Sequence, residues 1–229
     1  MKVFLLLALA AGLCLPACGA GEEAEPAGST ESSDPRTSLP DVALVVCKPG
    51  ETRLATPTVK PQPDGVHFQI ENETGSERSI SVLDPQGGGT GQGAPVGTSE
   101  LVVDLGPGTL EVACTDPRAD AKKGSSLEVV DEDGLWISTT LDCAAGFSGI
   151  SDYAPDARGD ADPLTAARDG LKGYTQPGDV VEPAGYPEAE TPLYRLVRAG
   201  QVLATVDLLD DGAGGWLPST VNGCSSLSD

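Results

Sequence analysis

Apolar and polar residues alternate with a period of two over much of residues 39–134, and this alternation predicts β-strands. Val66, Phe68 and Ile70 alternate with polar neighbours, and Ile80 and Val82 alternate with serines. Sequences rich in Gly, Pro, Asn and Asp separate these segments, as expected of turns. The strands expected on this basis cover residues 42–47, 66–70, 80–82, 101–105, 110–114 and 127–130. Short strands with this period predict a β-sandwich, and residues 87–97 are expected to form a glycine-rich loop.

Residues 135–229 show a different pattern, which predicts a small α+β domain. A strand is expected over 135–141, leading to Cys143, and an acidic loop over 151–162. Asp162 followed by Pro163 is typical of the start of a helix. Two apolar segments flank Ala199-Gly200 and predict a hairpin. With a last strand over 216–221, before Cys224, the pattern indicates a three-stranded β-meander with one short helix.

The cysteines are expected to form two disulfides. Cys114 lies on the same side of its strand as Leu110 and Val112, so its side chain should point into the core. Cys47 ends the only earlier strand with a cysteine, which favours a Cys47–Cys114 bridge. Cys143 and Cys224 lie at the two ends of the second unit, and a bridge between them would join those ends. Each bridge would contribute roughly 2–4 kcal/mol to stability.

The N-terminus reads as an export signal over residues 1–17. Lys2 precedes an apolar run, and Leu15-Pro16-Ala17-Cys18 closes it, which resembles the lipobox of bacterial lipoproteins, although Pro16 departs from the small residue preferred there. The resemblance implies cleavage before Cys18, a lipid such as palmitate on that residue, and anchoring to the outer side of the cell membrane. Residues 18–38 lack an apolar period and would be a disordered tether.

The alternative is ordinary cleavage after Ala17 or Ala20, which would release a soluble secreted protein. Removal of the signal takes Cys14 away and leaves an odd number of cysteines. Lipid on Cys18 would leave four cysteines for two bridges in an oxidising compartment. Cysteine parity therefore favours the lipid.

Composition and charge restrict the partners. The chain has 35 acidic and 14 basic residues and a formal net charge of −21, so binding of nucleic acid or anionic lipid headgroups is not expected. A cationic protein or peptide is compatible with this charge. Abundant Gly and Pro and an aromatic content of only 4% agree with short strands joined by turns.

A second resemblance concerns residues 64–72 and 107–114. The stretch Asp64-Gly65-Val66-His67-Phe68 through Glu71-Asn72, with the later Pro107-Gly108-Thr109-Leu110-Glu111-Val112-Ala113-Cys114, is similar to a cupredoxin-type sandwich. In that family the cysteine is a copper ligand beside histidines and often a methionine. Here His67 is the only histidine and Met1 the only methionine, so the resemblance implies a cupredoxin-like fold without copper ligands and no cofactor.

The C-terminal half also resembles small domains of proteins exported by Gram-positive bacteria with high genomic GC. The matching residues are Gly185-Tyr186-Pro187, Arg198-Ala199-Gly200-Gln201-Val202-Leu203-Ala204 and Gly214-Gly215-Trp216. This resemblance implies architecture and compartment and names no chemistry.

Candidate chemistry is sparse. His67 should face away from the core, and no catalytic triad pattern surrounds it. The acidic residues Asp152, Asp156, Asp160 and Asp162 are weak candidates for a calcium site, although their spacing is not that of an EF-hand. A second acidic cluster is formed by Asp207, Asp210 and Asp211. Trp136 and Trp216 are expected to anchor the core of the second domain. The leading hypothesis is a non-enzymatic binding or structural module, and the alternatives are a hydrolase with carboxylates in the 151–162 loop and a weak calcium-binding surface protein.

Overall fold

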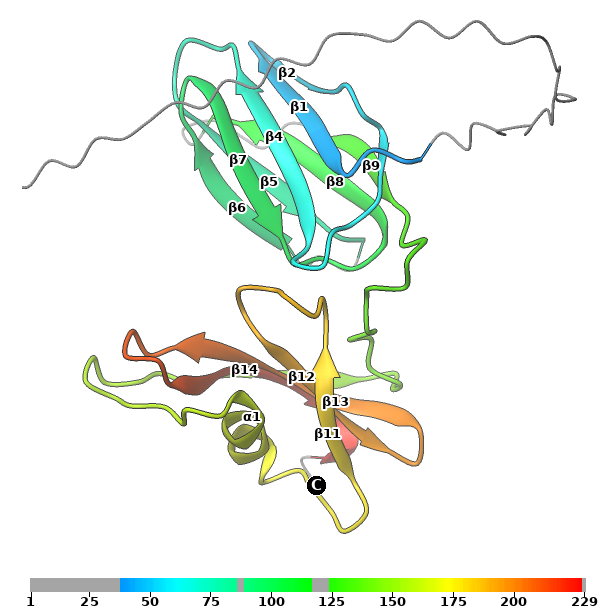
Figure 1. The fold of residues 1–229 in the computed structure, drawn as a ribbon, viewed down its shortest axis with the longest axis vertical. Coiled ribbons are helices and arrows are strands. Elements are labelled where there is room, and N and C mark those ends of the chain that lie inside the picture. The colour runs from blue at the N-terminus through cyan, green and yellow to red at the C-terminus, as the bar shows by residue number, and fades with distance from the viewer. Residues whose placement is uncertain (1–37, 86–88, 117–123, 228–229) are drawn as a thin grey trace, which may run out of the picture. The chain divides into compact units, whose positions relative to one another are not determined.

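A computed structural model describes residues 38–85, 89–116 and 124–227 (Figure 1), and the lipidation candidate Cys18 and the tether lie outside these residues. The first sheet has the order β2-β1-β4-β7 and contains β1 (Val42–Lys48), β2 (Glu51–Leu54), β4 (Val66–Asn72) and β7 (Gly97–Val103). β1 pairs in parallel with β4 and antiparallel with β2. Alternation places every second residue of β1 and β4 on one buried face, as the sequence pattern predicts.

A second sheet closes the sandwich. Its order is β3-β9-β8-β5-β6, and it contains β3 (Thr58–Val59), β5 (Arg78–Leu83), β6 (Gly89–Ala94), β8 (Gly108–Thr115) and β9 (Ser125–Val129). The inner faces of the two sheets share one core, whose largest fully buried side chains include Phe68, Ile70, Ile80, Leu110 and Leu127. The predicted β-sandwich is confirmed.

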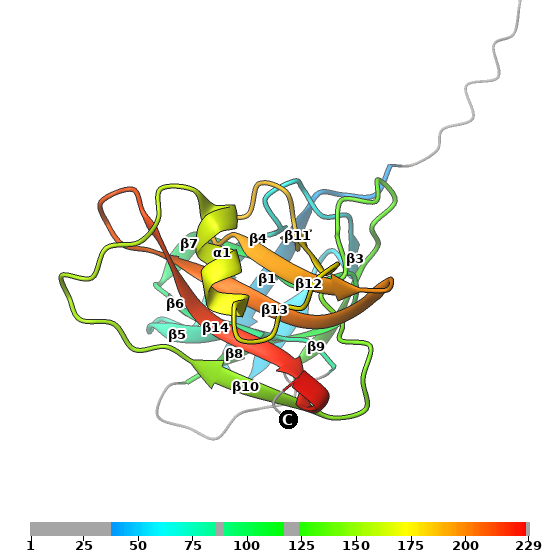
Figure 2. The same cartoon turned by 90° about the horizontal axis from the view of Figure 1, so that it is seen from below.

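The third sheet belongs to the C-terminal half. It has the order β10-β14-β13-β12-β11 and contains β10 (Gly146–Ile150), β11 (Val180–Ala184), β12 (Leu193–Arg198), β13 (Gln201–Asp210) and β14 (Trp216–Cys224). Helix α1 (Pro163–Leu171) packs against this sheet, and a 3₁₀ turn, η1 (Ser225–Leu227), follows β14 (Figure 2). Ala166, Ala167 and Leu171 of the helix join Leu196, Val206 and other strand residues in a second hydrophobic cluster.

Two local predictions in this half are confirmed. Asp162 is the N-cap of α1, its carboxylate accepts a hydrogen bond from Thr165 N at 3.2 Å, and Pro163 occupies the first turn. Ala199 and Gly200 have φ of 51° and 81° and connect β12 to β13, which is the backbone that a two-residue hairpin turn requires.

The strand prediction was wrong in several places. Residues 135–141 form no strand and make only an isolated bridge between Ile137 and Gly185. The expected three-stranded meander is the centre of a five-stranded sheet, because β10 and β11 add at its edges. The glycine-rich segment expected as a loop forms β6 from Gly89 onwards. β2, β3, β6, β10 and β11 escaped the pattern because all lie at sheet edges, where few residues are buried and alternation is weak.

The two disulfides join Cys47 to Cys114 and Cys143 to Cys224. These are the pairs that the strand pattern predicts. The first bridge links β1 to β8 and thus the two sheets of the sandwich, and the second links the start of the C-terminal unit to the end of β14. No helix within the described residues has the length and apolar content that a bilayer crossing needs.

Trp136 was expected to anchor the second domain, and that expectation is wrong. Its ring packs against the sandwich cluster and makes an edge-on contact with Tyr186, with the ring centroids 4.9 Å apart. Tyr186 is itself part of the sandwich core, and its hydroxyl donates to Leu105 O at 3.1 Å. Trp216 does join the C-terminal cluster. The domain boundary at residue 134 stays a prediction, since Trp136 and Tyr186 follow it in sequence.

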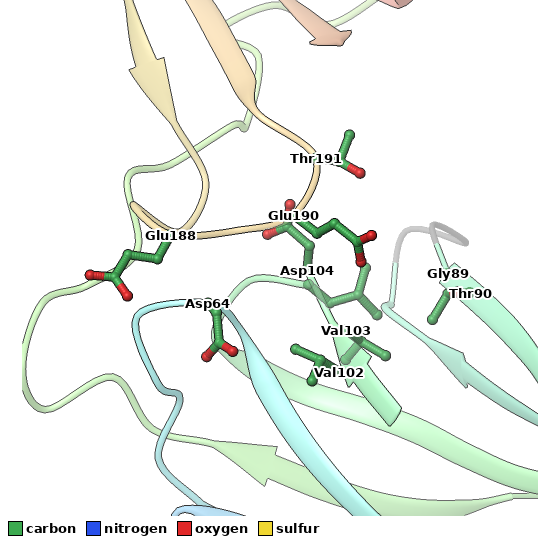
Figure 3. A pocket seen from close by; sticks show the side chains of 10 residues that line it. Asp64, Gly89, Thr90, Val102, Val103, Asp104, Glu188, Glu190 and Thr191 are labelled. Carbon is green, nitrogen blue, oxygen red and sulfur yellow. The ribbon is translucent and has the colours of Figure 1, made fainter. Parts of the chain in front are cut away.

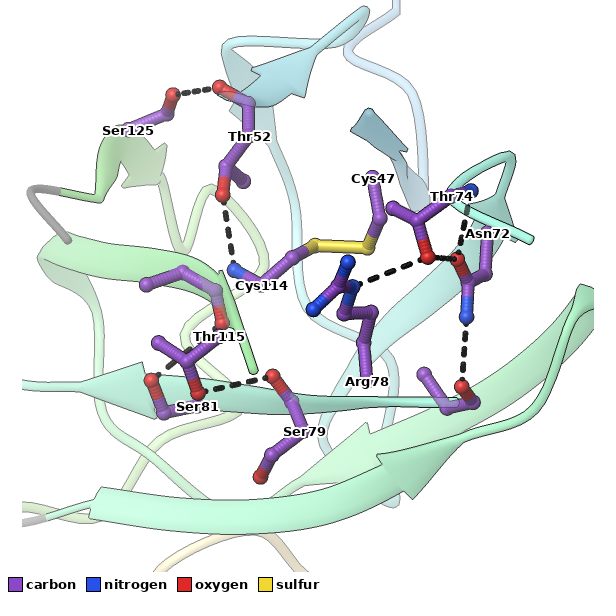
Figure 4. The surroundings of a disulfide bond; sticks show 12 residues. Cys47, Thr52, Asn72, Thr74, Arg78, Ser79, Ser81, Cys114, Thr115 and Ser125 are labelled. Atoms are coloured by element: carbon purple, nitrogen blue, oxygen red, sulfur yellow. Dashed lines mark hydrogen bonds between the residues drawn. A yellow bond between two sulfur atoms is a disulfide. The ribbon is translucent and has the colours of Figure 1, made fainter. Parts of the chain in front are cut away.

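Asn72 fixes the end of β4 (Figure 4). It is 2% exposed, and its Nδ2 donates to Ser76 O at 2.9 Å and Ala94 O at 2.8 Å. Its Oδ1 accepts from Thr74 N and Thr74 Oγ1 at 3.1 and 2.8 Å. Every polar atom of this buried side chain therefore has a partner, which the cost of burying polar groups requires.

We expect Asn72→Asp to lower the free energy of unfolding by about 2–3 kcal/mol, because the carboxylate cannot donate to the two carbonyl oxygens and would bury a charge. Urea unfolding at pH 7 measures the change. Gln92→Glu makes the same amide-to-carboxylate change at an exposed site of β6, opposite the uncharged Ile80, and a loss below about 0.5 kcal/mol is expected there. Equal losses for the two variants would contradict this role of Asn72.

Candidate acidic cavity site

Two adjoining cavities are lined by a group of acidic side chains, and this group is the candidate site among the described residues. The first encloses about 420 Å³ and is lined by Asp64, Asp104, Glu188 and Glu190, with threonines and apolar residues (Figure 3). The second encloses about 800 Å³, and its lining includes Asp84, Trp136 and Asp207. Gly89 and Leu105 line both cavities, so we treat them as one site and call it the acidic cavity.

The acidic residues reach this site from five separate parts of the fold, one of which is Asp84 directly after β5. Asp64 lies in the turn before β4, and Asp104 immediately follows β7. Glu188 and Glu190 lie between β11 and β12, in a segment that Glu188 N ties to Pro63 O at 2.9 Å. Asp207 lies on β13, opposite Leu193 in the register of the hairpin. Tertiary contacts, and no local motif, therefore assemble the site.

The environment of Asp104 disfavours its charge. Desolvation, together with the negative charge of Asp207, raises the pKa of Asp104 to about 6, against a smaller opposing effect of a hydrogen bond from the Tyr186 backbone N–H. The residue remains more than a third exposed, so it stays accessible to a ligand. Burial also raises the pKa of Asp207. The charge of Asp207 thus disfavours ionised Asp104, and a cation near these carboxyls would favour their charged forms.

No lysine, arginine or histidine lines either cavity within the described residues. His67 lies nearby and pairs with Asp64, with Nε2 2.7 Å from Oδ1, but its ring is not part of the cavity wall. Elsewhere three arginines are paired with carboxylates: Arg78 with Asp116, Arg195 with Glu182, and Arg198 with Asp179. The acidic cavity differs from those sites in that no basic side chain of the described residues lines it, and the contact of His67 with Asp64 is made from outside its wall.

The calcium candidates of the 151–162 loop are not brought together. Asp160 Oδ1 accepts from Asp162 N, and the Asp162 carboxylate caps α1, with the Thr165 hydroxyl as the main cause of its lowered pKa. Asp152 and Asp156 are exposed. Among the described residues, no group of three or more His, Cys, Asp or Glu side chains is placed to hold a metal ion.

The hydrolase alternative located its carboxylates in the same loop, and no residue of that loop lines either of the two cavities described above. Sequence reasoning missed Asp104, and it considered Asp207 only as part of an acidic cluster with Asp210 and Asp211. Asp104 and Asp207 are the described carboxyls with raised pKa. The only local signal was the Gly106-Pro107-Gly108 turn beside Asp104, which marks a place where backbone approaches another group closely. In the structure that group is Trp136, whose ring would lie 2.8 Å from a Cβ atom added at Gly106.

Comparison with known proteins matches no family model and no curated protein sequence. The resemblances to cupredoxins, to exported Gram-positive domains and to lipoproteins therefore stay predictions.

Proposed function

We propose that this chain is a lipid-tethered extracytoplasmic binding module without catalytic activity, and that its acidic cavity binds cationic groups of a protein or peptide partner. The observation that carries this proposal is the meeting of several carboxylates, two with raised pKa, in cavities without a basic lining residue. An ammonium or guanidinium group would neutralise charges that the fold leaves close together. The net charge of −21 would also speed the encounter with such a partner.

The cellular part of the proposal has separate support. Two disulfides are typical of proteins outside the cytoplasm, and the N-terminal sequence resembles that of lipoproteins. Mass analysis of the mature N-terminus from membranes tests the anchor, and an unmodified residue 18 would contradict it.

Titration with tetralysine at low ionic strength tests the acidic cavity. Asp104→Asn is expected to weaken binding about tenfold, which corresponds to one charge-assisted contact of about 1.4 kcal/mol. Asp156→Asn makes the same change at an exposed site outside the cavities, and less than a twofold effect is expected. Equal effects of the two substitutions would mean that tetralysine senses only the net charge, and would contradict the assignment of the site.

A hydrolase is the second candidate, and one observation favours it. A carboxyl with a pKa of about 6 near a second carboxyl resembles the environment of a general acid in carboxylate-dependent hydrolysis. Turnover of glycoside or ester substrates by the protein, lost in both Asp104→Asn and Asp207→Asn, would replace the binding module by this enzyme.

A further inference from the structure

The sheets of this protein end in six edge strands, and two of them lack the usual protection against pairing with another chain. β2 and β7 carry charged residues, β3 has only two residues, and β11 contains Glu182 and Pro183. Such features keep edge strands from accepting further strands. β6 and β10 contain no charged residue and no proline. Their edges are open to strand addition.

Of these two edges, β6 is the one that contributes residues to the acidic cavity. β6 has the sequence Gly-Thr-Gly-Gln-Gly-Ala, pairs antiparallel with β5 through six residues, and has no partner strand on its other side within the described chain. Its alternate glycines leave the strand without side chains on one face. Gly91 illustrates this, because a Cβ added there would meet no atom closer than 3.5 Å.

Carboxylates near the edge of β6 indicate which kind of peptide strand would bind there. Gly89 and Thr90 of β6 line the first cavity together with Asp104 and Glu190 (Figure 3). At the other end of the strand, Glu77 Oε1 lies 3.0 Å from a Cβ added at Gly93. Arg78 is opposite Ala94, but its guanidinium is already bound to Asp116 at 2.7 Å. A strand lying along β6 would therefore meet carboxylates at both ends. No residue of β10 lines either of these cavities, and nothing indicates what would cover its edge.

We propose that β6 accepts an extended basic peptide by strand addition, with lysine or arginine side chains of the peptide reaching the acidic cavity. This inference rests on the proposed function and specifies how the partner binds. Backbone hydrogen bonds to β6 would supply affinity that does not depend on the peptide's sequence, and the carboxylates would select alternate basic side chains. The partner class is a basic segment without internal structure, such as the tail of a cationic protein.

The test uses a six-residue peptide in which lysine alternates with valine, titrated into the full-length protein. Gln92→Lys adds a positive charge in the middle of β6 and is expected to weaken binding about tenfold. Gln69→Lys makes the same substitution at an exposed position of β4, a strand with neighbours on both sides, and less than a twofold change is expected. Equal effects of the two variants would overturn the inference.

Backbone methylation provides a second measurement that does not alter the protein. Only alternate residues of an added strand donate their N–H groups to the edge. Of two peptides N-methylated on the odd or on the even residues, one is expected to bind at least about tenfold more weakly than the other. Equal affinity of the two peptides would overturn strand addition, whereas the tetralysine result with Asp104→Asn would still stand and keep the acidic cavity as a binding site.

A second copy of the chain is the competing occupant of this edge. Sedimentation of the protein alone at increasing concentration detects it. A dimer that Gln92→Lys dissociates, and that Gln69→Lys leaves intact, would assign the edge to self-association and overturn the proposal. A monomer at all concentrations agrees with a separate basic partner.

Discussion

Replacing Cys47 and Cys114 together with alanine is expected to lower the free energy of unfolding by about 4 kcal/mol, because the bridge closes a long loop in the unfolded chain. The two residues are 67 positions apart and join opposite sheets of the sandwich (Figure 4). Cys47 is fully buried in the core, so its loss also removes packing. Urea unfolding of the double variant beside the oxidised wild-type protein measures the change.

The second disulfide is the matched control. Cys143 and Cys224 are 81 positions apart, so the loop contribution is nearly the same. Each bridge has one fully buried cysteine, Cys47 in the first and Cys224 in the second, but Cys143 is exposed whereas Cys114 packs against the sandwich core. The double alanine variant of the second bridge is therefore expected to lose somewhat less stability than that of the first. The exposed sulfur should also be reduced first by a small thiol. A larger loss of stability on removing the Cys143–Cys224 bridge would contradict the larger contribution expected of the Cys47–Cys114 bridge.

The parts of the fold that the sequence predicts are those that bury one face. β1, β4 and β8 place every second residue in the core, and that burial leaves a readable alternation. The same reasoning gave the disulfide partners, since the inward direction of Cys114 follows from its place beside Leu110 and Val112. Five of the six edge strands of the described sheets were missed, because much of their surface faces solvent. The edge strand β7 was predicted because it buries Leu101 and Val103 on one face.

The candidate site was beyond sequence reasoning for a different reason. Asp104 follows β7 of the first sheet, and Asp207 lies on β13 of the C-terminal sheet. The two residues are far apart in the sequence, and the charge of Asp207 acts on Asp104 only in the folded protein. In a chain with 35 acidic residues, clustering along the sequence drew attention to the 151–162 loop. Its carboxylates turned out to cap α1 and to accept loop hydrogen bonds. Desolvation, which distinguishes Asp104 from those residues, has no signature in the sequence.

Exposed glycine-rich segments are a related case. Residues 87–97 suggest a loop because glycine is rare within strands. β6 is stable as a strand because its partner β5 contributes the buried residues Ile80 and Val82, so that β6 need bury little beyond Ala94. The unprotected backbone edge of such a strand can form hydrogen bonds with a strand of another chain. This supports the inference that β6 meets another chain.

Lowering the pH from 7.5 to 4.5 is expected to weaken tetralysine binding about thirtyfold, because a carboxyl with a pKa near 6 passes from mainly ionised to mainly protonated over this interval. Asp207 adds to the loss, since its pKa is also raised. Carboxyls with ordinary pKa values stay largely ionised at pH 4.5, and lysine keeps its charge. Calorimetric titration at constant ionic strength measures the profile. In Asp104→Asn the same change of pH should weaken binding only about threefold, the part left to Asp207.

The free energy of unfolding is expected to change with pH in the opposite direction to tetralysine affinity. The effect of Asp104 on stability can therefore be measured apart from its effect on binding. The folded-state pKa of Asp104 lies above its ordinary value of 3.8, so between about pH 4 and 6 the folded protein binds more protons than the unfolded chain. The contribution of Asp104 to the free energy of unfolding therefore falls as the pH rises through this window. Asp104→Asn should remove that dependence and stabilise the protein at pH 7.5 relative to wild type. Two results would contradict this: an Asp104→Asn variant less stable than wild type at pH 7.5, or one whose stability depends on pH as strongly as that of wild type. Either result would mean that a favourable partner holds the Asp104 carboxylate, and it would remove the reason to expect a cation there.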